Sequence, residues 1–172
     1  MELNELEKFR VEKINKLKAN NIEPYPTRSY VNSTIRKACE AFEKAEAKGE
    51  TDSTEYIIAG RMRSLRVMGK LAFTHIEDST GKVQLFMRVN EMGEKLQFFK
   101  DYFDLGDFVE AKGTMMRTKS GELSLMTTDI RMLAKAVSPL PAAKDEVVDG
   151  KVISHTGLND PELRYRPRYA GL

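Results

Sequence analysis

The chain has 172 residues, of which 41% are hydrophobic and 31% charged, so it is long enough for one domain with a real core and an appendage. Its net charge of +2 does not indicate a nucleic-acid partner, so any such interpretation must come from local clusters of charge. The single cysteine, Cys39, excludes an intramolecular disulfide and fits a reducing cytoplasm. The N-terminus lacks the apolar core of a signal peptide, and no segment is apolar enough to span a membrane, so we expect a soluble cytoplasmic protein.

Helical patterns dominate residues 1–54, which we interpret as an N-terminal helical extension. An apolar stripe at helical spacing predicts a helix over residues 3–19. The stripe consists of Leu6, Phe9, Ile14 and Leu17. Two prolines around a tyrosine then force an extended path. A second helix is predicted to begin at a Ser33 cap and to end near Gly49, which suits a left-handed terminal residue.

From Glu55 the hydrophobic period changes from helical to alternating. The predicted strands span residues 56–63, 71–78, 83–89, 108–116 and 122–127, the last continuing over 130–133, and a helix is predicted over 91–102. Three short strands, a helix and two more strands match a mainly β fold, the five-stranded OB-fold Greek-key barrel. We assign this barrel to residues 55–137. Residues 138–172 are expected to be a linker in which 142–156 is flexible or hairpin-like.

Two basic loops are expected beside the ligand-binding side of this barrel. In the OB-fold, ligands lie across the second and third strands, between the first-to-second and fourth-to-fifth loops. Here these loops are residues 63–70 and 117–121, and both are basic. Cations in and beside them are candidates for contacts with phosphate, namely Arg66, Lys70, Arg88, Arg117 and Lys119.

The second and third strands carry the candidate base-binding residues. Both faces of the second strand are mixed, so alternation alone leaves Phe73 either in the core or facing outward, where its ring would stack on a base. Gln84 is either a solvated strand residue or a reader of uracil, because its carboxamide donates and accepts at once. Arg61 and Arg63 suit either phosphate and base carbonyls or a solvated edge.

Metal binding and catalysis have little support in the residues. His75 and His155 are the only histidines, they lie far apart, and no cysteine cluster accompanies them. His75 is better interpreted as a polar residue of the sheet face. Glu122, beside the second basic turn, suits either acceptance from a base N–H or pairing with Lys119. Neither a phosphate-cradling glycine loop nor a suggestively spaced Ser/His/Asp set is present.

Several long motifs resemble the anticodon-binding barrel of class II lysyl-tRNA synthetases. They are IAGRMRSLRVMGKLAFTHIEDSTGKVQLFMR, LGDFVEAKGTMMRTKSGELSL, RVEKINKLKANNIEPYP and the final PLP…DPELRYRPRYAGL, which together cover nearly the whole chain. The resemblance implies a barrel that grips a uridine-rich lysine anticodon loop with its bases splayed over the sheet. Phe73, facing outward, would stack on the central uracil, Gln84 and Arg61 would read it, and Glu122 would lie nearby. The candidate anticodon-binding residues are therefore Arg61, Arg63, Phe73, His75, Gln84 and Glu122.

The resemblance also implies that the chemistry lies outside this chain. The family's catalytic domain, which uses ATP and magnesium, would follow a sequence that here reads RYRPRYAGL, where the chain ends. We therefore expect a non-catalytic, cofactor-free fragment, itself monomeric, of a homodimeric lysine–tRNA ligase. Two alternatives remain open: a general single-strand binder that uses the same barrel, and a protein-interaction domain that uses the helical lead-in.

Overall fold

The computed structural model describes residues 3–138, 144–148 and 151–155. The chain divides into two compact units, 1–138 and 139–172, and the helical lead-in belongs to the same unit as the barrel. In the second unit, β6 (Lys144–Val148) and β7 (Lys151–His155) pair as an antiparallel hairpin, the second of the two forms expected for residues 142–156. The PLP motif and the RYRPRYAGL motif lie outside the described residues.

Helix α1 (Glu5–Ala19) confirms the first predicted helix, but half of its predicted apolar stripe is wrong. Leu6 and Phe9 are 46% and 52% exposed. The buried positions are Arg10, Lys13, Ile14 and Leu17. Two cations take the place of apolar residues on the buried side because their charged groups have acceptors outside α1. The Arg10 guanidinium donates to the carbonyl of Ala136, and Lys13 pairs with Asp104.

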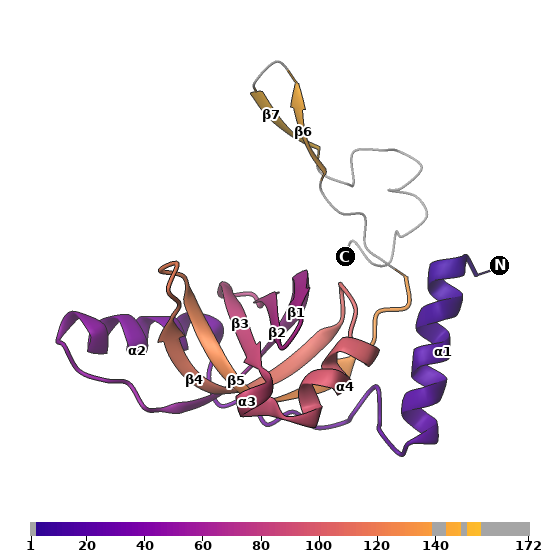
Figure 1. Ribbon diagram of the computed structural model, residues 1–172, viewed down its shortest axis with the longest axis horizontal. Helices are drawn as coiled ribbons and strands as arrows, with labels where there is room; N and C mark the ends of the chain where they lie inside the picture. The colour runs from indigo at the N-terminus through magenta and orange to yellow at the C-terminus, as the bar shows by residue number, and fades with distance from the viewer. Residues whose placement is uncertain (1–2, 139–143, 149–150, 156–172) are drawn as a thin grey trace. The chain divides into compact units, whose positions relative to one another are not determined.

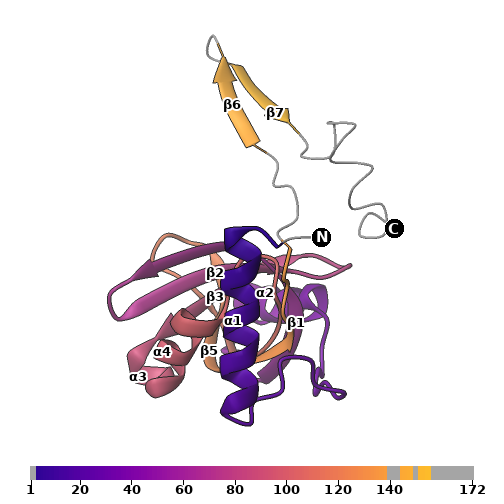
Figure 2. The same ribbon diagram turned by 90° about the vertical axis from the view of Figure 1, so that its right-hand side faces the viewer.

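Helix α2 (Ile35–Ala47) begins one residue later than predicted. The capping residue is Thr34, whose side chain accepts from the backbone N–H of Lys37, and not Ser33. The predicted left-handed residue, Gly49, has φ +71°. Ile35 and Ala38 lie in the core cluster of the barrel. Figures 1 and 2 show α1 and α2 on opposite sides of the barrel.

The predicted five-stranded barrel is confirmed. Its strands are β1 (Glu55–Met68), β2 (Leu71–Glu77), β3 (Lys82–Arg88), β4 (Phe108–Arg117) and β5 (Leu123–Ala134). They close in the order β1-β2-β3-β5-β4, and neighbours are antiparallel except for the parallel pair β3–β5 (Figure 1). The predicted helix between β3 and β4 is broken at Gly93, where φ is +58°, into α3 (Val89–Met92) and α4 (Glu94–Tyr102). Leu96 and Phe99 of α4 are buried.

Two strands are longer than the sequence indicated. Residues 64–68, predicted as a loop, extend β1 and pair with β2 up to the turn at Gly69 and Lys70. Their side chains are mostly exposed. These residues therefore lack the alternation of apolar and polar side chains by which a half-buried strand is recognised in a sequence. Strand β5 is continuous, and an irregularity opposite Lys112 and Gly113 explains the apparent interruption near Asp129.

Asp78 organises the turn between β2 and β3. Its carboxylate accepts from the backbone N–H groups of Thr80 (2.7 Å) and Gly81 (2.9 Å), and also from that of Ile35 (3.0 Å) at the start of α2. Burial alone would raise the pKa of Asp78, but these hydrogen bonds and that from the Thr80 hydroxyl outweigh it, so the pKa lies below its ordinary 3.8. One carboxylate therefore fixes both the turn and the entry to a core helix.

Replacement of Asp78 by Asn should lower the free energy of unfolding at pH 7 by about 1–2 kcal/mol, because the charge that strengthens these caps is lost. A carboxyl with a depressed pKa contributes stability above its unfolded-state pKa, and this contribution is lost as the pH falls through the folded-state value. The difference between the wild type and Asp78→Asn should therefore shrink below pH 3.8. Urea titrations across pH would test this; a constant difference would contradict it.

Candidate nucleic-acid interface

Strand β2 has one buried and one partly exposed face, and this alternation places Phe73. Ala72, Thr74 and Ile76 are buried, whereas Phe73 and His75 are partly exposed. The ambiguity left by the sequence is thereby removed, because the Phe73 ring lies on the outer side of the barrel. The outer face of β1, β2 and β3 is therefore where a ligand can meet an aromatic ring.

An aromatic row crosses this face. The register places Arg66 opposite Phe73, Phe73 opposite Phe86, and Phe86 opposite Met126. The two rings are stacked, with centroids 5.0 Å apart and planes inclined by 27°. Arg66 is exposed and forms no ion pair with the described residues. The row thus combines a flat apolar platform with an available cation at one end.

A polar row runs beside the aromatic row, displaced from it by two residues on each strand. It consists of Ser64, His75, Gln84 and Ser124, which are cross-strand partners in that order. Gln84 is only 9% exposed, so the expectation of a solvated glutamine is wrong. Its Oε1 accepts from the Ser124 hydroxyl at 2.9 Å. This bond orients the carboxamide and leaves its two N–H donors and one lone pair of Oε1 for a ligand.

Glu122 joins the polar row from the β4–β5 turn. The His75 ring lies between two partners, with Nδ1 2.7 Å from the Ser64 hydroxyl and Nε2 2.6 Å from Glu122 Oε1. The alternative partner named from the sequence, Lys119, is exposed and forms no ion pair within the described part of the chain. His75 therefore links strand β1 to the β4–β5 turn and fixes a carboxylate beside the polar row.

Three of the arginines predicted to contact RNA, one assigned to the anticodon bases and two to phosphate, are already paired. The pairs are Arg63 with Glu77, Arg88 with Glu91, and Arg117 with Glu46 of α2. The Arg117 pair is bidentate, at 2.6 and 2.8 Å, which directs this guanidinium to α2. By contrast, Arg66, Lys70 and Lys119 are exposed and form no ion pair among residues 3–138. These three retain an uncompensated charge for a phosphate.

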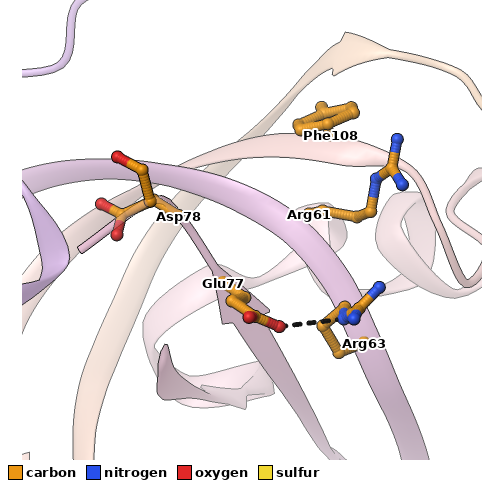
Figure 3. Close-up of a pocket in the computed structure, with 6 residues that line it drawn as sticks. Arg61, Arg63, Glu77, Asp78 and Phe108 are labelled. Carbon is orange, nitrogen blue, oxygen red and sulfur yellow. Dashed lines mark ion pairs between the residues drawn. The ribbon is translucent and has the colours of Figure 1, made fainter. Parts of the chain in front are cut away.

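Arg61 does not lie beside Gln84. The register puts Arg61 opposite Glu77, one row beyond the polar row, while Gln84 is opposite His75. Its guanidinium lies over the Phe108 ring at 4.6 Å (Figure 3). Arg66, assigned from the sequence to phosphate, is instead the arginine directly opposite Phe73. Only the strand register, with its irregularity between Met62 and Ser64, distinguishes these two positions.

Sequence reasoning did not find the two serines of the polar row. Ser64 bonds to His75 and Ser124 orients Gln84, yet a serine in an alternating strand has no distinctive pattern. Only the cross-strand pairing identifies these two serines, and this pairing cannot be read from the sequence of either strand. Within the described residues, no group of three or more His, Cys, Asp or Glu side chains is arranged to hold a metal ion. No described helix has the length and apolarity needed to cross a membrane.

Comparison with known proteins agrees with this geometry. Residues 56–133 match the tRNA anticodon family model, described as an OB-fold nucleic acid binding domain. The whole chain is 38% identical over 174 residues to the Lysine--tRNA ligase of Chloroflexus aurantiacus, and equally to that of Roseiflexus castenholzii. In each case it covers 32% of the relative's length. The barrel of this chain therefore matches the OB-fold nucleic acid binding domain of the tRNA anticodon family model, in a polypeptide similar along its whole length to the N-terminal part of lysine–tRNA ligases.

Proposed function

We propose that the outer face of β1, β2 and β3 binds the uridine-rich anticodon loop of a lysine tRNA. The observation that carries this proposal is the adjacency of the two rows, an aromatic platform at Phe73 and Phe86 beside hydrogen-bonding groups at Gln84 and Glu122. RNA-binding domains read unpaired bases by stacking one face on an aromatic ring and hydrogen-bonding the edge. A base stacked on Phe73 would present its edge to the polar row.

Uracil suits the donors and acceptors of the polar row. Its edge carries a carbonyl beside an N–H, and the Gln84 carboxamide offers an N–H donor beside an acceptor lone pair. Ser124 supports this arrangement because it occupies one lone pair of Oε1 and thereby fixes which end of the amide donates. Cytosine presents an amino group where uracil presents a carbonyl, so it would set a donor against the Gln84 N–H.

The relatives of this chain are longer enzymes, and the chain corresponds to one part of them. The chain spans about a third of the length of its curated relatives. We propose that attachment of lysine to tRNA, with its requirement for ATP and magnesium, resides in the remaining two thirds of such an enzyme. This chain would then recognise tRNA without catalysis or a cofactor of its own. We further propose that the whole enzyme is a cytoplasmic homodimer that acts in protein synthesis. The present chain by itself would be a monomer.

The proposal predicts binding that depends on one base. Fluorescence anisotropy at low salt would compare a lysine anticodon stem-loop with one whose central uridine is replaced by cytidine. We expect the replacement to weaken binding about tenfold, because it leaves buried polar groups without a partner. Equal affinity for the two loops would favour a general single-strand binder. Absence of binding to any RNA, with a protein captured through residues 1–50, would favour the interaction domain.

A further inference from the structure

Two arginines bracket the outer face along β1. Arg66 lies in the aromatic row and Arg61 lies beyond the polar row, opposite Glu77. Neither forms an ion pair within the described residues, although Arg63, between them, is paired with Glu77. Their partners on β2, Phe73 and Glu77, are four residues apart, which corresponds to about 13 Å of strand. The face therefore has an uncompensated cation at each end.

Arg61 lies in a shallow pocket at its end of the face. The pocket has a volume of about 300 Å³ and is lined by Arg61, Arg63, Glu77, Asp78, Ser79 and Phe108 (Figure 3). The Arg61 guanidinium rests on the Phe108 ring, and Phe108 is 39% exposed. Stacking on a ring restricts a guanidinium without neutralising it, so the cation is held in place while its terminal N–H groups keep their capacity to donate.

The acidic residues of the pocket do not neutralise Arg61. Glu77 pairs with Arg63, through Arg63 Nε at 2.9 Å, which leaves the two terminal nitrogens of Arg63 free to donate. The Asp78 carboxylate is occupied by backbone N–H groups of the β2–β3 turn and of α2. In Figure 3 the Arg61 guanidinium points toward Phe108 and away from both carboxylates. The pocket thus presents two guanidinium groups with available donors, of which one has no counter-charge.

We propose that this pocket is a phosphodiester-binding subsite for the same RNA strand, separate from the base-binding rows. Arg61 and Arg63 would donate to the non-bridging oxygens of one backbone phosphate, a geometry that guanidinium groups suit well. The strand would run along β1 and β2 from Arg66 to Arg61, with the read base stacked on Phe73 between the two contacts. This inference rests on the proposed function, because it assigns the path of the RNA that the rows bind.

The test combines a protein variant with a chemical change in the RNA. Stem-loops would each carry one uncharged methylphosphonate linkage, placed at successive loop positions, and their affinities for the wild type and for Arg61→Gln would be measured by anisotropy. We expect Arg61→Gln to weaken binding of the unmodified loop about tenfold and to lower the slope of log K against log salt by about 0.7. One linkage whose neutralisation weakens the wild type should cause a clearly smaller loss in Arg61→Gln, because only Arg63 would still contact that phosphate.

Three further variants make the result specific. Arg66→Gln should weaken binding but keep the sensitivity to that linkage, because its own contact lies at the other end of the face. Phe108→Leu removes the ring beneath Arg61 but keeps the charge, so it should retain sensitivity to the linkage even if the fold is weakened. Arg131→Gln, a paired arginine on β5 facing Glu110, should bind like the wild type.

The outcomes separate this inference from the proposed function. If the wild type discriminates the central base but Arg61→Gln binds as tightly as the wild type, the subsite is wrong and the base-binding face stands. The same conclusion follows if every neutral linkage weakens binding to Arg61→Gln by the same factor as it weakens binding to the wild type. If the wild type binds no stem-loop at low salt, both proposals fail. Loss of base discrimination in Arg61→Gln would also overturn the subsite, because it would place Arg61 in base reading.

Discussion

Phe73→Ala is expected to weaken binding of the lysine anticodon stem-loop about 5- to 150-fold while the chain stays folded. The size follows from base–aromatic stacking, which contributes roughly 1–3 kcal/mol per base. The ring lies on the outer face and packs mainly against Phe86, so its removal leaves the core cluster intact. We expect a loss of stability of about 1 kcal/mol, the scale of one aromatic pair. Anisotropy and thermal denaturation measure the two effects separately.

Phe9→Ala provides the matched control for this variant. Phe9 is also an exposed phenylalanine, with a cation over its ring, because Lys13 lies 4.7 Å from the ring centroid. It lies on α1, however, and outside both rows, so its loss should leave RNA affinity unchanged. If Phe73→Ala instead unfolds the chain, the ring belongs to the core and the assignment of faces is reversed. Equal loss of affinity in both variants would remove the special role of the aromatic row.

Lys135→Met is expected to cause the largest loss of stability. Lys135 is completely buried, and its ammonium lies 2.7 Å from Asp104 and 2.6 Å from Asp107. Asp104 also accepts from Lys13 of α1. The network therefore joins the lead-in helix to the segment that precedes β4 and to the residue that follows β5. Burial raises the pKa of the Asp107 carboxyl, and the Lys135 charge counteracts this. Removal of the cation would leave the buried Asp107 carboxylate without its cationic partner, which costs about 3–5 kcal/mol.

Urea denaturation would measure this loss against a surface control. Lys95→Met breaks an ion pair with Asp129 in which both side chains are about half exposed, and such pairs contribute no more than about 1 kcal/mol. The account therefore predicts a large gap between the two variants. A loss of less than 1 kcal/mol in Lys135→Met would show that the buried network does not hold α1 to the barrel. An equal loss in Lys95→Met would point to a general effect of removing a lysine.

The barrel could be predicted from the sequence because alternation of hydrophobicity and turn residues are local signals. The bounds of β2 and β3, each within one residue of its prediction, and the left-handed Gly49 followed from patterns a few residues long. The same signals misplaced the buried side of α1. Phe9 was expected inside, but the Ala136 carbonyl and the Asp104 carboxylate favour buried cations at Arg10 and Lys13. A helix's own sequence does not reveal what its partner presents.

The site required cross-strand register, which no local pattern supplies. Phe73 could be assigned to the outer face only through the resemblance, and alternation in β2 alone was ambiguous. The resemblance assigned Arg61 to the read base and Arg66 was assigned to phosphate, but the irregularity in β1 sets Arg66, and not Arg61, opposite Phe73. Similarly, Glu122 had two possible partners, and the closed barrel brings it to His75, 47 residues earlier in the chain. Contacts of this kind depend on the whole fold.

An NMR titration of the ¹⁵N-labelled chain with the lysine anticodon stem-loop would show whether the outer face of β1, β2 and β3 binds the anticodon. It records which backbone amides change their environment when the RNA binds, independently of any substitution. The account predicts that the largest shift changes fall on Phe73, His75, Gln84 and Glu122, with small changes on the exposed side of α1. Shift changes concentrated on α1, with the outer face of β1, β2 and β3 unaffected, would contradict it.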